Sequence, residues 1–291
     1  MITFCGFSNR SSGQIRGKQV STKIEGADFL DIDRLDYRVP HNKTVIHVRK
    51  FRSDHAEFVK KMGGRVGFDV SDNPVTDFLY GRVKEDDFSR YVHKSIDFYI
   101  VNNDVTVKEL SKHTDRPIYV IPHHNCNFKK VHKKLRKPKN LGYIGLPEQS
   151  ISEGKLDNIC KKFNLNFINR DIKEFSKFDD VFSEIDIGLV YFDLIEEKKE
   201  LQEKILKYKP VTKLCNFQSY GIPTVCLPYE SFKQFGEGKN LFVKTIEEVE
   251  GQIDRLMSDD FYESLSRDSV VVGEKFHIEN VVDYYKRIVE R

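Results

Sequence analysis

The most informative stretch of this sequence is residues 208–225, YKPVTKLCNFQSYGIPTV. Pro210 closes an extended loop, and Thr212 is predicted to cap a short helix that follows it. Gly221 is typical of the residue that ends a helix, and Pro223 precedes an apolar run that fits a strand. The stretch therefore predicts a loop, a helix and a buried strand, in the order found in parallel α/β sheets.

The predicted helix carries polar side chains close to its start. Leu214 and Phe217 share one face at helical spacing, which predicts that this face packs on a sheet. Lys213 lies near the helix start, where backbone N–H groups already favour anions and a lysine adds positive charge. Asn216 follows one turn later and could hydrogen-bond a sugar hydroxyl. From these residues alone, an anion site and an ordinary helix with one solvated lysine are equal alternatives.

Outward from this stretch, short apolar runs alternate with longer amphipathic ones. Strands are predicted at 2–7, 29–32, 44–48, 66–70, 98–101 and 118–121, and again at 141–144, 165–168, 187–192 and 224–227. The helices predicted between them include 14–24, 53–62 and 77–93. This alternation favours mainly parallel sheets covered by helices. The strongly basic run 129–140 separates the two halves and is interpreted as a hinge. We therefore expect a first domain at 1–128, a hinge at 129–140, a second domain at 141–272 and a closing helix at 273–291.

The composition is that of an ordinary globular protein. The chain has 291 residues, of which 39% are hydrophobic, and a net charge of +3. No run approaches the roughly 18 apolar residues of a membrane span, and Met1–Phe7 lacks the basic head of a signal peptide. The five cysteines are scattered, which favours reduced thiols and a cytoplasmic protein. The low net charge does not favour nucleic acid as a partner, although a local basic patch remains an alternative.

Six residues of the opening stretch carry a resemblance to a known family: Pro210, Lys213, Leu214, Gly221, Pro223 and Val225. They resemble the donor-site segment of GT-B glycosyltransferases, especially those that retain the anomeric configuration. The resemblance implies two Rossmann-like domains whose parallel sheets face each other across a cleft, the first for the acceptor and the second for the nucleotide sugar. It also implies that Lys213 and the helix start hold the diphosphate of a UDP- or GDP-sugar. Tyr208 and Asn216 stand where the family has glutamates, which leaves the ribose contact open.

Weaker likenesses extend the predicted donor site. Gly145 follows the strand at 141–144 and would approach the donor phosphates, and Tyr191 would lie near the carboxyl end of the strand at 187–192. Gly13 lies in a polar loop, residues 8–17, after the first strand, where a glycine permits close approach of the backbone. The predicted donor-binding residues are Gly13, Gly145, Tyr191, Lys209, Thr212, Lys213 and Asn216.

Three residues are predicted to act in catalysis. Arg16 would stabilise the charge of the departing nucleotide, and Asp72 would orient or deprotonate the acceptor hydroxyl. His123 would be an acid or base that faces the cleft. Each residue also has an alternative without function. Arg16 could belong to an ordinary turn from strand to helix, and Asp72 could be a turn-forming aspartate. His123 could be a histidine of the hinge with satisfied hydrogen bonds.

The sequence predicts no metal and no cofactor apart from the donor. Asp31-Ile32-Asp33 matches an acidic Asp-x-Asp triplet but is assigned to the second strand rather than to a strand end. His123, His124, Cys126 and His132 do not match the spacing of a structural zinc site.

The predicted function is that of a metal-independent hexosyl- or pentosyltransferase. Its acceptor would be a hydroxyl of a glycan or, less favoured, of a modified DNA base. A non-catalytic nucleotide-sugar-binding protein and an epimerase of the same fold are the alternatives.

Overall fold

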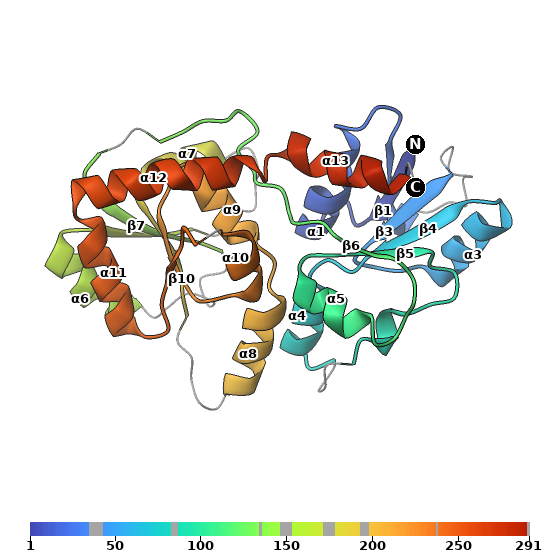
Figure 1. Ribbon diagram of the computed structural model, residues 1–291, viewed down its shortest axis with the longest axis horizontal. Helices are drawn as coiled ribbons and strands as arrows, with labels where there is room; N and C mark the ends of the chain where they lie inside the picture. Colours follow the sequence, from blue (N-terminus) through green and yellow to red (C-terminus); the bar gives the residue numbers. More distant parts are fainter. Residues whose placement is uncertain are drawn as a thin grey trace. The chain divides into compact units, whose positions relative to one another are not determined.

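A computed structural model of the chain describes residues 1–34, 43–82, 87–133, 136–145, 153–170, 178–192, 198–236 and 238–289. The chain forms two compact units. Unit 1 comprises Met1–His123, Lys207–Pro210 and Ile278–Arg291, and unit 2 comprises His124–Leu206 and Val211–His277. Each unit is a parallel sheet with helices packed on it (Figure 1). The predicted fold class, α/β with two parallel sheets, is confirmed.

Unit 1 is built on a six-stranded sheet in the order β2-β1-β3-β4-β5-β6, with every neighbouring pair parallel. Its strands are β1 (Ile2–Gly6), β2 (Asp28–Asp31), β3 (Thr44–Val48), β4 (Arg65–Asp69), β5 (Phe98–Val101) and β6 (Ile118–Val120). Its helical segments are α1 (Ser11–Gly13), η1 (Gln14–Lys18), α2 (Gln19–Ser21), η2 (Ile32–Arg34), α3 (Ser53–Lys61), α4 (Asn73–Leu79), η3 (Ser89–Tyr91), α5 (Asp104–Leu110) and α13 (Ile278–Val289).

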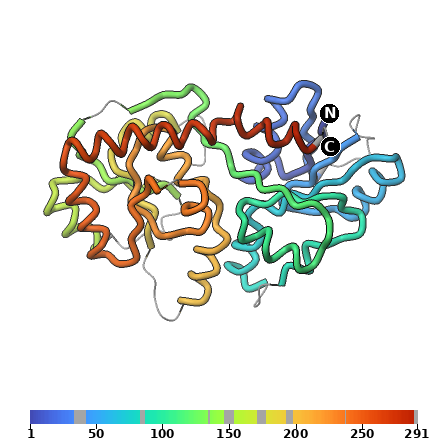
Figure 2. The backbone as a smooth tube through the Cα atoms, viewed as in Figure 1, coloured from blue at the N-terminus to red at the C-terminus, as the bar shows by residue number. Residues whose placement is uncertain are grey.

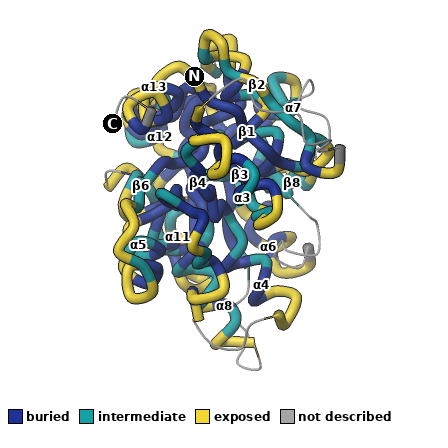
Figure 3. The backbone as a smooth tube through the Cα atoms, turned by 90° about the vertical axis from the view of Figure 1, so that its right-hand side faces the viewer, coloured by how far each residue is buried: buried dark blue, intermediate teal, exposed yellow. Residues whose placement is uncertain are grey.

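All residues of β1, β3 and β5 are buried, and since successive side chains of a strand point to opposite faces, both faces of the sheet are covered at these strands. On one face Phe4 and Ile46 pack with Val281 and Tyr285 of α13. On the other face Val45 packs against α3. Figure 2 shows the end of the chain, in red, beside its blue start, and Figure 3 shows the central strands β1 and β3 in the colour of buried residues. The last helix thus completes the core of unit 1.

Two predicted helices of unit 1 differ from those observed. The helix expected at 77–93 begins earlier, as α4, because Pro74 fits the first turn of a helix. It ends near Gly81, whose φ of +61° stops helical continuation. The helix expected at 14–24 begins earlier, at Ser11, and its centre is the π-helix η1.

Unit 2 is built on a five-stranded sheet in the order β11-β10-β9-β7-β8, again parallel throughout. Its strands are β7 (Asn140–Ile144), β8 (Asn166–Arg170), β9 (Ile187–Val190), β10 (Thr224–Cys226) and β11 (Leu241–Phe242). Its helices are α6 (Glu153–Phe163), α7 (Phe178–Glu184), α8 (Lys199–Tyr208), α9 (Thr212–Ser219), α10 (Glu230–Phe235), α11 (Ile246–Leu256) and α12 (Asp259–Glu274).

The basic run that was interpreted as a hinge is bound to unit 2 wherever it is described. Lys133 Nζ lies 2.9 Å and Arg136 Nε 3.0 Å from Oδ1 of Asp186, a fully buried carboxylate. Burial alone would raise the pKa of Asp186, but hydrogen bonds from Lys133 and Arg136 hold it below its ordinary value. Lys129 and Lys130 pair with acidic groups of the same unit. Each of these four cations therefore has an acidic partner within unit 2, and Lys133 is the buried one.

Each sheet has one point where the strand order reverses, so that the connections on its two sides run in opposite directions across the sheet. In unit 1 this point lies between β1 and β3, and in unit 2 it lies between β7 and β9. In open parallel sheets, ligands bind beside the carboxyl ends of the strands at such a point. A ligand is therefore expected beside the residues that follow β1 and β3 in unit 1, and beside those that follow β7 and β9 in unit 2.

Candidate functional site

The first candidate site lies in unit 2, where β7 meets the start of α9. Lys213, the second residue of α9, donates from Nζ to Oη of Tyr143 over 2.7 Å, and the same Nζ lies 4.1 Å from the centre of the Tyr143 ring. Tyr143 is the fourth residue of β7 and is buried. Its hydroxyl and ring together hold the ammonium group at the carboxyl end of β7. Sequence reasoning chose Lys213 but did not choose Tyr143 as a site residue.

Gly145 lies against the same ammonium group. A Cβ added to Gly145 would stand 2.6 Å from Lys213 Nζ, and the residue has a φ of +147°. Both features require glycine, because a side chain would strain the backbone and displace the lysine. The predicted donor residues Gly145 and Lys213 are therefore neighbours in space, although 68 positions separate them in the sequence.

Helix α9 positions two more of the predicted donor residues. Thr212 is its first residue and not its cap: Val211 takes the cap position, and no side chain caps the helix. The expectation of a Thr212 cap was wrong. Asn216 uses Oδ1 to accept the backbone N–H of Cys126 over 2.9 Å. The amide NH₂ is therefore the part of Asn216 that could meet a ligand.

Three predicted donor residues remain, and one of them, Gly13, lies in unit 1 in the loop after β1. Tyr191 follows β9, is buried, and donates its hydroxyl to the carbonyl of Lys244 at 3.4 Å. Lys209 belongs to the short segment that is counted with unit 1. Burial lowers the pKa of Lys209, and the negative charge of Asp72 acts in the opposite direction.

The loop after β1 is shaped by Gly13 and Arg16. A Cβ on Gly13 would lie 1.9 Å from the carbonyl oxygen of Phe7, so glycine is needed for the loop to close on itself. Arg16 is 1% exposed; its Nε lies 2.8 Å from Asp69 Oδ2, and its Nη1 donates to the carbonyl of Ile121 over 2.6 Å. This contradicts the prediction that Arg16 faces a departing nucleotide, because its charge is buried in an ion pair.

The acceptor-side predictions fall at the ends of unit 1 strands. Asp72 precedes α4 and its carboxylate lies 3.7 Å from Arg49 Nε, with about a third of the side chain exposed. His123 is buried and is the last residue of its segment of unit 1. Asp31 does stand at a strand end, contrary to expectation, but the Ser8 hydroxyl and the Asp33 N–H both donate to its carboxylate.

A pocket of about 760 Å³ opens in unit 1 beside the end of β1, where Phe7 and Arg10 line it. Residues that follow β3 line it as well, among them Arg49 and Lys50, as do Asn73, Thr76 and Asp77 of α4. It thus lies at the reversal point of this sheet, and its volume falls within the roughly 300–1,000 Å³ of ligand pockets. Asp72 lies one residue before the helix that forms one wall.

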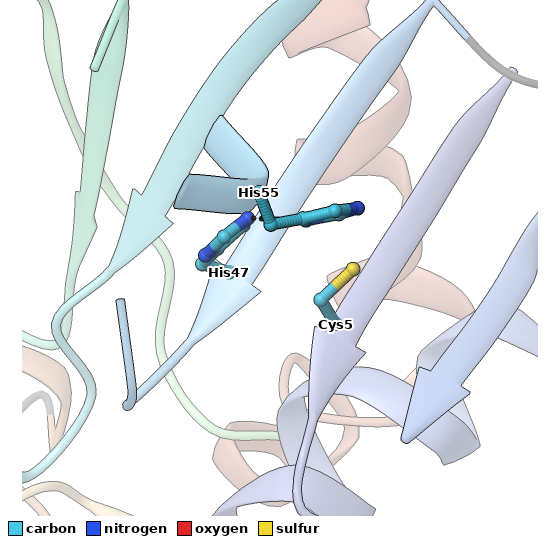
Figure 4. Close-up of side chains that lie close together, drawn as sticks. All are labelled: Cys5, His47 and His55. Atoms are coloured by element: carbon cyan, nitrogen blue, oxygen red, sulfur yellow. Dashed lines mark hydrogen bonds between the residues drawn. The ribbon is translucent and has the colours of Figure 1, made fainter. Parts of the chain in front are cut away.

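Sequence reasoning missed a buried cluster in unit 1 that consists of Cys5, His47 and His55 (Figure 4). His47 Nε2 lies 3.1 Å from His55 Nδ1, and the backbone N–H of Arg52 donates to His47 Nδ1 over 3.0 Å. The residue types suit a transition metal, and each side chain offers an atom within 4.8 Å of the others. No local spacing could reveal the cluster, because its members come from β1, β3 and α3.

The hydrogen bonds of this cluster do not suit metal ligation. Since His47 Nδ1 accepts a proton donor, its Nε2 must carry the proton and donate to His55. If a metal replaced the proton on His47 Nε2, the imidazole would carry no proton on either nitrogen, since Nδ1 accepts the Arg52 N–H. The ring would then have to be an anion. Burial, and then the charge of His55, lowers the pKa of His47 to about 3, and burial raises that of Cys5 to about 12. His47 and His55 thus form a neutral hydrogen-bonded pair, and burial keeps the neighbouring Cys5 thiol protonated.

Two of the four residues that the sequence offered as a zinc cluster have other surroundings. His124 Nδ1 lies 2.7 Å from the Asn125 carbonyl oxygen, while His132 is exposed.

No family model matches the chain, and no curated protein matches it by sequence. Solved structures do match. HepE of Anabaena, solved in complex with UDP-glucose, aligns with a TM-score of 0.63 and 8% identity over 100% of this chain and 99% of HepE. AviGT4, a glycosyltransferase involved in avilamycin A biosynthesis, aligns with a TM-score of 0.56 and 9% identity over 100% of this chain and 97% of AviGT4. The GtfA/B complex aligns with a TM-score of 0.55 and 14% identity over 85% of this chain, which spans 56% of the GtfA/B chain.

These likenesses identify the architecture. The chain has the GT-B fold of glycosyltransferases, as the resemblance in its sequence implied. Among the described residues, no helix combines the length and the apolar character needed to cross a bilayer.

Proposed function

We propose that this protein is a glycosyltransferase that moves a sugar from a nucleoside-diphosphate donor to an acceptor hydroxyl. The observation that carries the proposal is the group formed by Lys213, Tyr143 and Gly145. It lies at the reversal point of the unit 2 sheet, beside a helix start, in a chain with the GT-B fold. The structure of HepE with UDP-glucose supports UDP-sugars as the first donors to test.

The donor diphosphate would bind at the Lys213 ammonium group and the first backbone N–H groups of α9. The first turn of a helix has amide protons without intrahelical acceptors, and a cation beside them adds to the attraction for phosphate. When the sugar leaves, negative charge grows on the diphosphate, and this preformed positive site would stabilise it. Asn216 would donate its amide NH₂ to a ribose oxygen. This neutral hydrogen bond would be weaker than the bond that a ribose hydroxyl makes to the charged glutamate of the family pattern.

The acceptor would bind in unit 1, in the pocket beside β1 and β3. Asp72 is our candidate for orienting or deprotonating the acceptor hydroxyl. We keep no catalytic role for Arg16, whose charge the Asp69 ion pair holds in the core. The proposed reaction does not use a metal ion, and sugar transfer should therefore persist in a buffer that contains a chelator.

The test is a calorimetric titration with UDP, GDP and TDP, followed by a screen of sugar donors for released nucleotide. We expect one nucleoside diphosphate to bind, and we expect Lys213→Ala to weaken it at least about tenfold, since a hydrogen bond to a charged group contributes about 1.5–3 kcal/mol. Lys161→Ala is the matched control, because Lys161 is exposed on α6 of the same unit. Absence of binding by all three nucleotides would exclude the proposal. Binding without release or transfer from any donor would favour a non-catalytic protein.

A further inference from the structure

The pocket of unit 1 has an unusual balance of charge. Among the described residues, five cationic side chains line it, but only one carboxylate does. The cations are Arg10, Arg49, Lys50, Arg82 and Arg90, and the carboxylate is Asp77. A pocket built for a neutral sugar needs mixed donors and acceptors with little net charge. An excess of guanidinium groups instead fits a ligand that carries an oxyanion, because the planar guanidinium donates two parallel hydrogen bonds to carboxylate, sulfate or phosphate.

Two carboxylates neutralise only part of this charge: Asp77, and Asp72, whose carboxylate lies 3.7 Å from Arg49 Nε. Asp77 lies 3.6 Å from Arg82 and 3.7 Å from Arg90, and it already accepts the hydroxyl of Tyr91 over 2.7 Å. Neither Arg10 nor Lys50 has a carboxylate partner among the described residues. Lys50 Nζ lies 4.9 Å from the centre of the Phe7 ring. Arg10 and Lys50 therefore give the pocket a positive charge that the described chain does not balance.

Arg49 is held in place by its backbone as well as by its side chain. Its φ is +68°, which is uncommon for a residue with a side chain. Its N–H donates to the carbonyl of Asp69 over 2.8 Å, and its guanidinium bonds Thr76 Oγ1 at 3.1 Å and Ser12 Oγ at 3.3 Å. Strained backbone that neighbouring contacts maintain is concentrated at functional sites. The pocket thus contains one fixed guanidinium group and two cations that are less constrained.

We infer that the acceptor of this enzyme is a sugar that carries an oxyanion, bound in the unit 1 pocket with the anion facing Arg10, Arg49 and Lys50. The inference rests on the proposed function, since it names the acceptor class for the same reaction. The rings of Phe7 and Tyr80 give the pocket apolar surface on which a sugar face can pack. A nucleic acid is disfavoured, because its binding needs cations spread along a track, whereas these cations share one cavity.

The experiment compares ligands that differ only in charge. Glucose, glucose 6-phosphate, glucose 6-sulfate and glucuronic acid are titrated by ligand-observed NMR in low salt, with saturating UDP present to occupy the donor site. A ten-nucleotide oligothymidylate forms a separate arm. The variants are Arg10→Gln/Lys50→Gln and, as a control with the same loss of charge, Lys18→Gln/Lys108→Gln, whose lysines are exposed outside the pocket on η1 and α5.

We expect at least one charged hexose to bind about tenfold more tightly than glucose, and the pocket double variant to remove most of that difference while the control keeps it. The ranking of phosphate, sulfate and carboxylate then identifies the anion. Equal binding of neutral and charged hexoses, or an equal loss in both double variants, would overturn the inference. Tighter binding of the oligonucleotide, with a steep dependence on salt, would overturn it in favour of a nucleic acid.

The two proposals fail in different ways. If UDP binds through Lys213 but the charged hexoses show no preference, the acceptor inference fails and the proposed function stands. If no nucleotide binds, the same titrations are run without UDP. A charge-selective pocket would then remain in a protein whose proposed function is wrong.

Discussion

Replacing Gly145 by alanine tests whether the donor site is built as proposed. The added Cβ would lie 2.6 Å from Lys213 Nζ, whereas non-bonded atoms rest at about 3.5–4.0 Å. The lysine is flexible, so its ammonium group should move by about 1 Å and leave the Tyr143 hydroxyl. The φ of +147° adds backbone strain of about 1–3 kcal/mol, which should lower the thermal midpoint.

The size of the binding effect follows from what the lysine contributes. Lys213→Ala should cost about 1.5–3 kcal/mol in UDP binding, or about 10- to 150-fold in Kd. Gly145→Ala should cost a similar amount, because it removes the same ammonium group from the same place. The double variant should bind no more weakly than Lys213→Ala alone, since no ammonium group then remains to be displaced.

The assay is a double-mutant cycle by calorimetry with UDP at low ionic strength, using only variants whose circular dichroism matches the wild type. The coupling free energy between positions 145 and 213 should be nearly as large as the loss of UDP-binding free energy in either single variant. Additive losses would show that Gly145 and Lys213 act independently. The proposed grouping at the end of β7 would then be wrong.

Three other predictions concern unit 1. Burial lowers the pKa of His47 from its ordinary 6.5 to about 3 in the folded chain. As the pH falls, the imidazole of His47 is therefore protonated in the unfolded chain before it is protonated in the folded chain. The free energy of unfolding of unit 1 should therefore fall as the pH drops from 6.5 towards 3, by about 2 kcal/mol at pH 5. Hydrogen exchange of the β3 amides measures this loss. If His47→Gln shows the same pH dependence as the wild type, the prediction is wrong. Arg16→Met should lower the stability of unit 1 by about 3–5 kcal/mol in the same measurement, because it leaves the Asp69 carboxylate buried without its cation. Unaltered exchange in that variant would show that the ion pair is dispensable. Excess zinc should leave the thermal midpoint unchanged, and a rise that disappears in His55→Ala would reveal a metal site at Cys5, His47 and His55.

The sequence predicted the elements well wherever local chemistry decides them. The strands at Thr44–Val48 and Phe98–Val101 have their predicted bounds, because runs of β-branched and aromatic residues fit a sheet that is buried on both faces. Helix α9 begins at Thr212, one residue before the start that a Thr212 cap implied, and ends before Gly221, whose φ is +74°. The helix expected at 77–93 was misplaced, because Pro74 starts a helix earlier than the apolar pattern alone suggests.

The sequence by itself determined the fold class, and its donor-like segment indicated the GT-B architecture. It also singled out Lys213 and Gly145, since a lysine at a helix start and a glycine after a strand are local features. Only the tertiary structure decided what these residues touch. Long-range packing brought Lys213 to Tyr143, buried Arg16 against Asp69 and gathered the cations of the unit 1 pocket. The reason is that a parallel sheet places the ends of distant strands side by side, and no spacing along the chain records which side chains meet there.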